Sequence, residues 1–557
     1  MKRFAAILVM GMFATIGISS CVKEEAPSED KEDQDEVEVI EKPSFDYSPE
    51  AVKAVLNEEQ HKLFNYFWTK TANGVGINNE RASSNLTFTL GGSGFGVMAM
   101  IIGAERGWIT REQAAQRIAT ACKFLDRTMR MHGVWSHWVD RNGMPKKFGT
   151  QIQAGDVVET SFMLMGLICA SKYFDGESND EKTIREKTNY FLNTVEWDFY
   201  TNNEKKLYWL WEKTDGKYNL PIGGYNEAMI CYILAMSCPN DDHRLNAEHY
   251  LNGWQRNGKI YNSGRKVYGY PLPMGNAKFG GPMFLSHYSF LGLDPKMQDS
   301  YVNYFDNCAW HTMVNRHYCI ECAPARYGYN EYMWGLTACD GPKGKGYKAR
   351  NPANDDGVIA PTAALGSMPF TPFYSIQMLL NLHFNHPELN TDLGFCDSFS
   401  FVDKWIDDNN IAIDQGAAIV MIENYRSGLF WSLTAGDQDL ERGLQAARLG
   451  KPRFKNGFIY CYPDIRTGVY DIIRHPDKGF YELNYWTSSS DTEIGFYLID
   501  ESGHEDEIAS KTFGEGSTYG QNCLNFALGE GLEAEKTYSV KMKISGNPVS
   551  TLKIRLH

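Results

Sequence analysis

Helical stripes recur along most of this 557-residue chain, and they constrain its fold more than any other feature. Between residues 50 and 70, apolar side chains stand three and four positions apart, which is the spacing of one helix face. The same spacing follows Thr110, a residue type that caps helices, over residues 111–128. Further stretches lie near 94–106, 157–174, 182–196, 225–237, 243–255, 298–312, 371–384, 417–433 and 436–449. Long connections containing Gly, Asn and Trp separate them, so we expect paired helices in an all-α toroid whose loops form a cleft at one end.

The pattern changes after Lys451, where short runs alternate apolar with polar residues between Asp, Gly and Ser turns. These runs cover 457–462, 481–486, 495–499, 538–543 and 551–556. Such spacing is typical of a β-sandwich, and it predicts a helical domain over 48–450 and a separate sandwich-like all-β domain over 451–557. The β domain could bind carbohydrate or act only as a packing spacer, because fold alone does not assign function.

The N-terminus has the form of an export signal. Met-Lys-Arg precedes an apolar run from Phe4 to Ile18, which is too short to span a membrane. The run ends in Ile-Ser-Ser-Cys21, which resembles a bacterial lipobox, so removal of residues 1–20 and acylation of Cys21 are expected. We therefore expect an exported lipoprotein held on the bacterial outer membrane through a lipid at Cys21, with an ordinary cleavage site as the alternative.

Residues 21–47 are expected to form a flexible stalk. From Val22 to Glu41 the chain has ten acids, two lysines and almost no large apolar groups, a composition that cannot bury enough surface to fold. This stretch carries −8 of the formal −14, and the signal segment carries +2, so the remaining chain carries only −8. A nucleic-acid partner is therefore not expected.

The cysteines indicate buried thiols. Eleven follow Cys21 without paired spacing, many in apolar stretches such as those around Cys169 and Cys231. Cys319 and Cys322 form a CxxC pair, but no second pair or histidine follows at zinc-finger spacing. No metal site is predicted from these residues.

The glycine-rich segment 91–96, Gly-Gly-Ser-Gly-Phe-Gly, leads into a predicted helix and invites comparison with a phosphate-binding loop. No βαβ pattern surrounds it and no Lys-Ser or Lys-Thr follows. We interpret these glycines as allowing close helix packing at a turn.

Several acids stand among apolar or aromatic neighbours, where a carboxylate is costly unless it is paired, hydrogen-bonded or catalytic. They are Asp156, Glu159, Glu227, Glu331, Asp414 and Glu423. Each alone can be structural, and Asp156, at a predicted helix start, can be a cap. Glycoside hydrolysis requires one protonated carboxyl in an apolar pocket and a second ionised one. Glu227 lies between Tyr225 and a wholly apolar helix, a context that raises a carboxyl pKa, so it is the predicted acid.

Six motifs follow one another between about Leu56 and Leu449. They are GGSGFGVMA from Gly91, GDVVETSF from Gly155, GYNEAMI from Gly224, GPMFLSHYSFLGLD from Gly281, IAPTAA from Ile359, and the segment from Ile413-Asp-Gln-Gly to Glu423-Asn-Tyr-Arg. Together they resemble the glycoamylase-like domain, whose characterised relatives are the family-144 glycoside hydrolases. Those relatives are endo-β-1,2-glucanases with an (α/α)6 barrel. The resemblance implies an (α/α)6 main domain that hydrolyses a β-linked glucan, most specifically β-1,2-glucan.

The resemblance also implies roles for particular acids. The Asp of the Gly-Asp-Val-Val-Glu-Thr motif and the Glu of the Gly-Tyr-Asn-Glu motif are critical for activity in the family, and they fall here on Asp156 and Glu227. The general base is then Asp156 or Asp414, and the favoured inverting mechanism requires carboxyls about 6.5–9.5 Å apart. Many relatives carry a further Asp where this chain has Ile152, so the resemblance implies the linkage less securely than the fold.

Other residues in these motifs are assigned to sugar stacking and hydroxyl contacts. The candidates are Arg81, Glu159, Trp209, Trp211, His287, Tyr288, Glu331, Trp334 and Glu423. For the three tryptophans, core packing is the alternative. No cofactor is expected, since carboxylates and water suffice for glycosidic cleavage. Two other functions stay open: a non-catalytic glycan-binding surface lipoprotein, and a glucoamylase-like enzyme acting on another glucan.

Overall fold

A computed structural model describes residues 43, 45–46, 49–275 and 277–450, followed by segments 468–475, 480–487, 493–512, 520–527, 536–544 and 546–555. Its α-helices are α1 (Pro49–Thr69), α2 (Gly91–Glu105), α3 (Arg111–Arg127), α4 (Val157–Tyr173), α5 (Asn179–Thr194), α6 (Met229–Ser237), α7 (Ala247–His249), α8 (Tyr304–His317), α9 (Pro361–Leu365), α10 (Pro372–Asn385), α11 (Ala412–Ser427), α12 (Leu429–Thr434) and α13 (Gln438–Ala446). Within these described segments, no helix combines the length and apolar character that a membrane span requires. The predicted signal, Cys21 with most of the stalk, and the predicted strand at 457–462 lie outside the described residues.

Short antiparallel strands occupy the connections between helices. They are β1 (Phe88–Thr89), β2 (Arg130–Met131), β3 (Val134–Trp135), β4 (Trp138–Val139), β5 (Ala154–Asp156), β6 (Tyr208–Glu212), β7 (Lys217–Pro221), β8 (Lys266–Val267), β9 (Tyr270–Pro271), β10 (Ala338–Cys339), β11 (Lys348–Ala349), β12 (Asn390–Thr391), β13 (Gly394–Phe395), β14 (Phe399–Ser400) and β15 (Trp405–Ile406). Strands β5, β6 and β7 form one three-stranded sheet, and the others pair two by two. The loops are therefore stiffened by local hydrogen bonds rather than by a large sheet.

Most predicted helices are confirmed. Helix α8 begins at Tyr304 rather than at 298, and the stretch predicted over 243–255 contains only α7 and a π-helical turn over Tyr250–Trp254. Two further differences concern α6 and α11. Helix α6 begins at Met229 rather than at 225, because the Asn226 side chain accepts a backbone hydrogen bond and forms a turn before it. The helix expected over 417–433 divides at Gly428, whose φ of 67° ends α11 in the left-handed conformation. The difference at α6 matters because it leaves Glu227 in a turn.

The glycines of α2 bring it unusually close to α4. A Cβ on Gly94 would stand 2.3 Å from the Phe162 carbonyl oxygen, and one on Gly166 would stand 2.2 Å from the Gly94 carbonyl oxygen. Only glycine allows two backbones to approach this far. The interpretation of the glycine-rich segment as a helix-packing device is confirmed.

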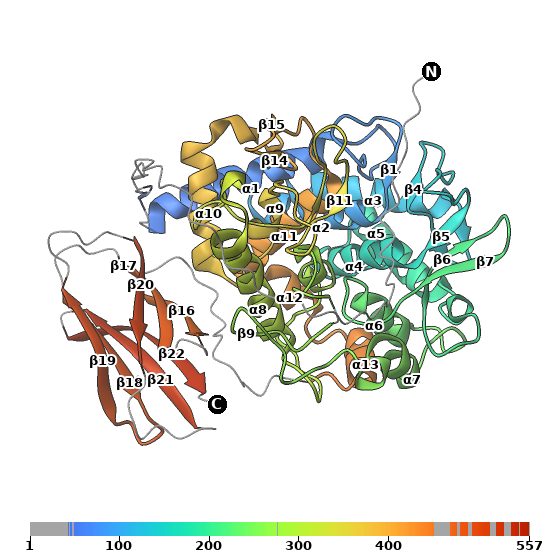
Figure 1. Cartoon of the computed structure of the whole chain (residues 1–557). Helices are drawn as coiled ribbons and strands as arrows, with labels where there is room; N and C mark the ends of the chain where they lie inside the picture. The colour runs from blue at the N-terminus through green and yellow to red at the C-terminus, as the bar shows by residue number, and fades with distance from the viewer. Residues whose placement is uncertain are drawn as a thin grey trace, which may run out of the picture.

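Helices α2, α4 and α11 lie together in the middle of the helical body (Figure 1), and the close approaches of their residues show that they run in the same direction. Gly91 at the start of α2 contacts Glu159 in the first turn of α4. On the other side of α2, Gly92 meets Ala412 at the start of α11. Helix α6 joins them at the same end, where the Cys231 thiol contacts the first carbonyl of α4. The N-termini of four buried helices therefore lie together.

Amphipathic helices cover this buried set. Helix α1 runs antiparallel to α2, because Phe67 packs beside Gly96 and Phe64 packs beside Gly103. Helices α3 and α5 bury only one stripe of side chains each, whereas α2 is buried from Gly91 to Gly103. An apolar helix inside and amphipathic helices outside follow directly from their residue patterns.

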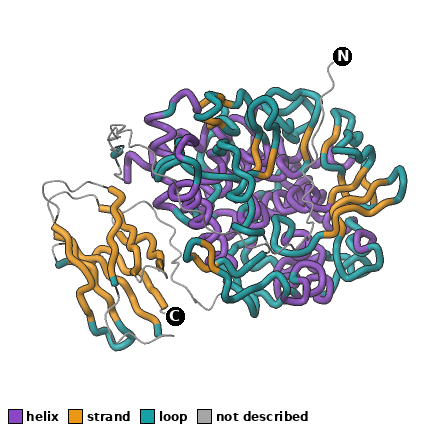
Figure 2. The backbone as a smooth tube through the Cα atoms, in the orientation of Figure 1, coloured by secondary structure: helices purple, strands orange, loops and turns teal. Residues whose placement is uncertain are grey.

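The C-terminal strands lie together beside the helical body (Figure 2). They are β16 (Gly468–His475), β17 (Phe480–Thr487), β18 (Glu493–Ile499), β19 (Glu505–Thr512), β20 (Gly520–Phe526), β21 (Thr537–Ile544) and β22 (Asn547–Arg555). They form two antiparallel sheets, in the orders β16-β17-β20 and β19-β18-β21-β22. Tyr485 of the first sheet contacts Phe496 of the second, with ring centroids 4.7 Å apart. The strands predicted over 481–486, 495–499, 538–543 and 551–556 are confirmed.

Nine cysteines lie in the described part of the chain, all as free thiols. Every one of them except Cys322 is buried. For these residues the prediction of buried thiols is confirmed, and the CxxC pair of Cys319 and Cys322 divides into one buried and one exposed thiol.

Candidate active site

Four of the predicted acids stand at the joined helix N-termini. Asp156 caps α4, Glu159 lies in its first turn, Asp414 lies in the first turn of α11, and Glu227 precedes α6 by two residues. Because helix N-termini carry partial positive charge, they favour carboxylates at these positions. The fold thus gathers acids that are up to 258 residues apart in sequence.

Both carboxyl oxygens of Asp156 are engaged. Its Oδ1 accepts hydrogen bonds from the backbone N–H groups of Val158 and Glu159, each at 3.0 Å. Its Oδ2 lies 2.8 Å from Nδ1 of His137. The helix-cap interpretation of Asp156 is confirmed, and the carboxyl is fully enclosed.

His137 joins Asp156 to Glu159 and was not singled out from the sequence. Burial by itself lowers the pKa of His137, but the neighbouring Glu159 and Asp156 outweigh it and raise the pKa to about 9. The ring stacks on Phe148 at 3.8 Å. Glu159 accepts a 2.6 Å hydrogen bond from Gly91 N–H, and burial raises the pKa of this carboxyl. His137 therefore supplies positive charge behind the acids; its only sequence signal is its place between Trp135 and Trp138.

Glu227 differs from the other three acids because it stays partly exposed. Burial of the carboxyl, with a further contribution from the charge of Asp156, raises the pKa of Glu227 to about 7. The backbone around it is held by Ser289, whose hydroxyl donates to the Glu227 carbonyl and accepts from Ile230 N–H at 3.1 Å. Glu227 thus stands on a fixed backbone, with a pKa near neutral pH and a side chain that stays partly exposed.

Asp414 lies deeper, beside Tyr288. The Tyr288 hydroxyl donates to Asp414 Oδ1 at 3.0 Å, and no hydrogen-bond donor among the described residues reaches Oδ2. Burial raises the pKa of Asp414. Tyr288 packs against Phe95 of α2 and Phe162 of α4, so its ring stands where the buried helices meet.

Arg81 and the two tryptophans of β6 occupy the surroundings of these acids. The Arg81 guanidinium is paired with Asp340, and its backbone bridges to Ile411 just before α11. Strand β6 pairs with β5, where Leu210 stands opposite Asp156. Since side chains alternate along a strand, Trp209 and Trp211 lie on the face opposite to Leu210 and Asp156. The Trp211 ring contacts Phe199 at 5.1 Å, and both tryptophans stay partly exposed.

Glu423, a predicted substrate contact, lies away from the other acids. Glu423 stands nine residues after Asp414 on α11, which places it about 13 Å further along the helix. There its carboxylate takes two hydrogen bonds from Arg106, at 2.9 and 2.6 Å, and one from Gln60 at 3.1 Å. Arg106 follows the C-terminus of α2, so this ion pair closes the end opposite to the acids.

His287 and Trp334, two further predicted substrate contacts, both lie in the interior. His287 Nε2 is 2.9 Å from the Ser367 hydroxyl, and burial lowers its pKa to about 3. Trp334 is fully buried in the hydrophobic core, so its alternative of core packing is confirmed. Glu331 lies in the loop after α8, where its carbonyl accepts from Arg316.

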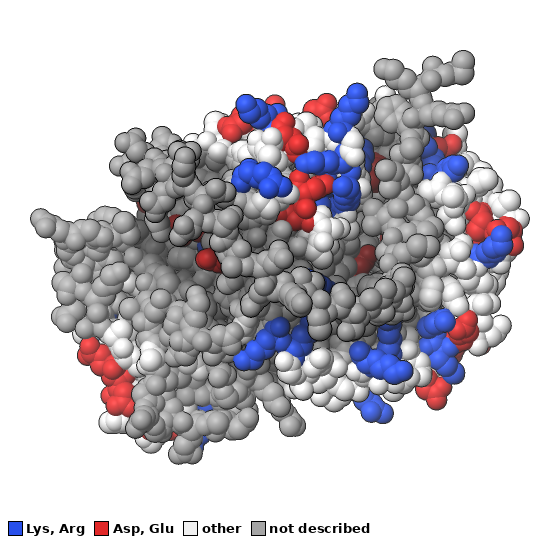
Figure 3. Space-filling view, in the orientation of Figure 1, with Lys and Arg blue, Asp and Glu red and all other residues white. Residues whose placement is uncertain are grey.

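Two groups of described residues have the ligand types and spacing for a metal ion. One comprises Glu58, Glu59 and His383, and the other comprises Asp340, Asp397 and Asp407. Lys62 already bonds both glutamates of the first group, at 2.7 and 2.9 Å. The pairing of Lys62 with these glutamates is typical of the molecular surface, because the described acids visible in Figure 3 also lie near lysines and arginines. In the second group Asp397 and Asp407 are buried and Asp340 is partly exposed, and Asp397 adjoins Asp414.

A partly exposed carboxyl with a raised pKa, set on a fixed backbone beside further carboxyls, suits the acid/base chemistry of glycoside hydrolases. The Glycoamylase family model matches residues 219–437, the part of the chain that carries Glu227, Tyr288 and Asp414. The chain is 37% identical over 425 residues to an exo β-1,2-glucooligosaccharide sophorohydrolase of Parabacteroides distasonis. That match covers 71% of this chain and 58% of the relative, so the chain spans little more than half of that protein.

Solved structures give the same result over the full length of a relative. The endo-β-1,2-glucanase of Chitinophaga pinensis is 39% identical, with a TM-score of 0.68, and the match covers 72% of this chain and 99% of that one. A β-1,2-glucanase of Parabacteroides distasonis is 36% identical, with a TM-score of 0.67, over 71% of this chain and 60% of that one. The chain belongs to the glycoamylase-like family of glycoside hydrolases, and the resemblance read from its six motifs is confirmed.

Proposed function

We propose that this protein hydrolyses a β-linked glucan, most specifically β-1,2-glucan, with Glu227 as the general acid. The observation that carries the proposal is the state of Glu227, whose pKa is raised to about 7 while the side chain stays partly exposed. A general acid works best when its pKa lies near the working pH and when it can reach the leaving oxygen. The β-1,2-glucan substrates of the named relatives support the linkage.

Asp414 is the better candidate for the general base. Asp156 has both oxygens occupied by Val158, Glu159 and His137, whereas Asp414 Oδ2 accepts no hydrogen bond from a described donor. The Tyr288 hydroxyl holds the other oxygen of Asp414 in place. In this scheme Asp414 activates water for an inverting displacement, while Asp156 raises the pKa of Glu227 through its charge.

Product analysis tests this proposal. Purified protein is incubated with linear β-1,2-glucan, and the products of the wild type, Glu227→Gln and the surface control Glu186→Gln are separated. We expect short β-1,2-linked oligosaccharides from wild type and control and none from Glu227→Gln, with inverted anomers by NMR. Release of sophorose alone would indicate exo action, and mixed lengths would indicate endo action. Turnover of an α-glucan, or binding without cleavage of any glucan, would contradict the proposal.

The finer architecture and the location are part of the same proposal. We infer that the helices form an (α/α)6 toroid over 48–450, followed by a sandwich-like domain over 451–557. The shared direction of α2, α4 and α11 and the two C-terminal sheets support this inference.

The protein is proposed to be held on the outer membrane through Cys21, so Cys21→Ser should move it from the membrane fraction to the soluble fraction.

A further inference from the structure

Three carboxylates meet beside the proposed active site, and each comes from a different turn of chain. Oxygen atoms of Asp340, Asp397 and Asp407 all lie within 4.8 Å of one another. Asp340 follows β10, Asp397 precedes β14, and Asp407 follows β15. Pairing of β14 with β15 brings the last two together, and the Asp407 N–H donates to the Ser398 carbonyl at 2.9 Å. The cluster is therefore set by the backbone rather than by flexible side chains.

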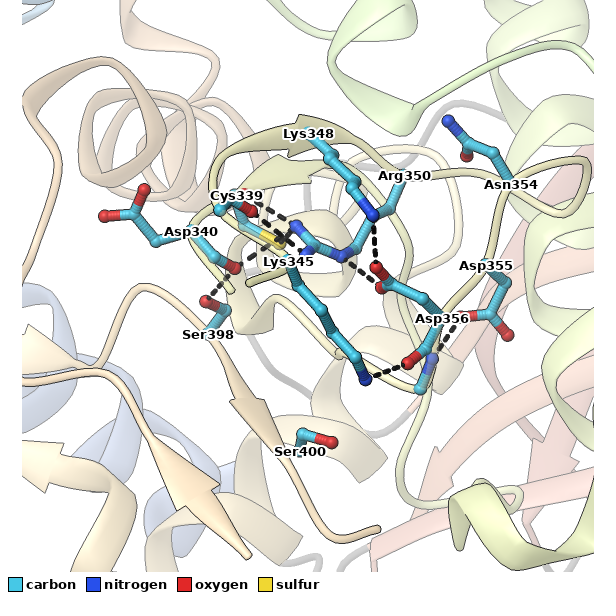
Figure 4. A network of polar contacts seen from close by, with 12 residues as sticks. Cys339, Asp340, Lys345, Lys348, Arg350, Asn354, Asp355, Asp356, Ser398 and Ser400 are labelled. Atoms are coloured by element: carbon cyan, nitrogen blue, oxygen red, sulfur yellow. Dashed lines mark hydrogen bonds and ion pairs between the residues drawn. The ribbon is translucent and has the colours of Figure 1, made fainter. Parts of the chain in front are cut away.

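The position of Asp340 is fixed from behind by Arg350. This fully buried guanidinium donates to the Cys339 carbonyl at 2.7 Å and to the Asp340 carbonyl at 3.2 Å, and it pairs with Asp356 at 2.7 Å. Ser398 donates to the same Asp340 carbonyl at 2.8 Å. Figure 4 shows the Asp340 side chain directed away from this network. The carboxylate itself pairs with Arg81 and lies beside the other two acids.

The cluster is only partly compensated by the described residues: Arg81 pairs with Asp340, Asp340 N–H donates to Asp397 Oδ2 at 2.9 Å, and Asn409 N–H donates to Asp407 Oδ1 at 3.2 Å. Asp397 is fully buried, and its Oδ1 has no hydrogen-bond partner. Asp407 is 8% exposed, and its Oδ2 has none either. Asp414 adds a fourth carboxyl nearby. Buried carboxylate oxygens without partners are strongly destabilising, so this arrangement requires a further positive charge or protons.

We propose that Asp340, Asp397 and Asp407 bind a hard divalent cation, and that Ca²⁺ fits best. All three ligands are carboxylate oxygens, which suit Ca²⁺ and Mg²⁺ rather than Zn²⁺ or Cu²⁺. Opposed oxygens on Ca²⁺ stand up to about 5 Å apart, whereas on Mg²⁺ they stand about 4 Å apart in a stricter octahedron. Oxygens within 4.8 Å of one another can meet on a single ion, and the flexible coordination of Ca²⁺ places fewer demands on their geometry than the strict octahedron of Mg²⁺.

Such an ion would join the β10–β11 loop to the β14–β15 hairpin at the N-terminus of α11. The ion would hold these loops beside Asp414. This structural role is not required by the proposal that the protein hydrolyses a glucan. The competing arrangement is a cluster neutralised by protons, because burial and the neighbouring acids raise the pKa of Asp397 well above its usual range.

The experiment compares the full-length wild type with Asp407→Asn and with Asp408→Asn, the exposed neighbour. Each protein is dialysed against EDTA and then titrated with CaCl2 or MgCl2 at constant ionic strength. The wild type and Asp408→Asn should gain about 2–5 °C in Tm with millimolar CaCl2, more than with MgCl2, and Asp407→Asn should gain less than 1 °C. Tb³⁺ offered to the EDTA-treated protein should luminesce through the neighbouring Trp405, and CaCl2 should quench the signal.

The outcomes separate this site from the catalytic proposal. No Ca²⁺-dependent rise in Tm and no Tb³⁺ signal in the wild type would mean that protons neutralise the cluster, and the proposal would be wrong. An equal CaCl2 response in Asp407→Asn and the wild type would also overturn it. Loss of activity in Glu227→Gln affects neither the Ca²⁺-dependent rise in Tm nor the Tb³⁺ signal. Each proposal can therefore fail without affecting the test of the other.

Discussion

The acids at the two ends of the buried helices α2 and α11 differ in how completely hydrogen-bond partners surround them. At the C-terminal end of α2, Glu423 accepts hydrogen bonds from Arg106, Gln60 and Ser427. At the N-terminal end, Asp414 has one donor, and Glu227 keeps a raised pKa and partial exposure. A buried carboxylate with a complete set of partners holds helices together, whereas an incompletely compensated one is available for chemistry.

The largest expected effect is on catalysis at the N-terminal end. Glu227→Gln keeps the shape of the side chain and removes its proton transfer, so kcat should fall by about 10²–10⁴-fold. The Tm should stay within about 1 °C of the wild type, because the side chain is partly exposed. Steady-state kinetics on β-1,2-glucan and a thermal melt give both values. A large fall in Tm with unchanged kcat would reverse the comparison between the two ends.

The second prediction concerns the C-terminal end. Glu423→Gln leaves Arg106 beside a neutral partner, and breaking a buried ion pair should lower the free energy of unfolding by about 3 kcal/mol. The kcat of the remaining folded protein should match the wild type, since Glu423 is about 13 Å along α11 from Asp414. Urea unfolding measures the first quantity. A loss of kcat without loss of stability would restore Glu423 as a site residue.

A third prediction tests the contact that sets the two helices side by side. Gly94→Ala introduces a methyl group 2.3 Å from the Phe162 carbonyl oxygen, so α2 and α4 must separate. Overpacking of this kind costs about 1–3 kcal/mol in stability. The control variant is Glu186→Ala, at an exposed position of α5. Gly436→Gln cannot serve as a control, because the backbone φ of Gly436 is positive and a glutamine there would be strained. Equal melts for the two variants would mean that the close approach is not needed.

The smallest expected effect is a pH dependence. Because the pKa of Glu227 is raised to about 7, the acid is protonated below this pH and loses its proton above it. The kcat/KM should therefore fall about five- to sixfold between pH 7 and pH 8 and then approach a tenfold fall per unit. A profile measured from pH 5 to pH 9 checks the alkaline limb. An activity that stays constant up to pH 9 would exclude Glu227 as the proton donor.

Local patterns in the sequence predicted the helices well, but they could not distinguish the structural acids from the acids of the active site. Asp156, Glu227 and Glu423 share one signal, a carboxyl among apolar neighbours, and the sequence treated all three as site residues. The partner that makes Glu423 structural is Arg106, 317 positions away in the chain. His137 was missed for the same reason, since its importance comes from two carboxylates that the fold places around it.

What the sequence by itself determined is the set of buried helices, their glycine contacts, the β-rich C-terminus and the family motifs, because each depends on neighbours within a few turns of chain. Only the tertiary structure decided which acids lack partners, that Asp340, Asp397 and Asp407 meet, and that Glu227 remains open to solvent. These properties depend on distance and burial in space, and an acid's charge and reactivity follow from the groups around it rather than from its neighbours along the chain.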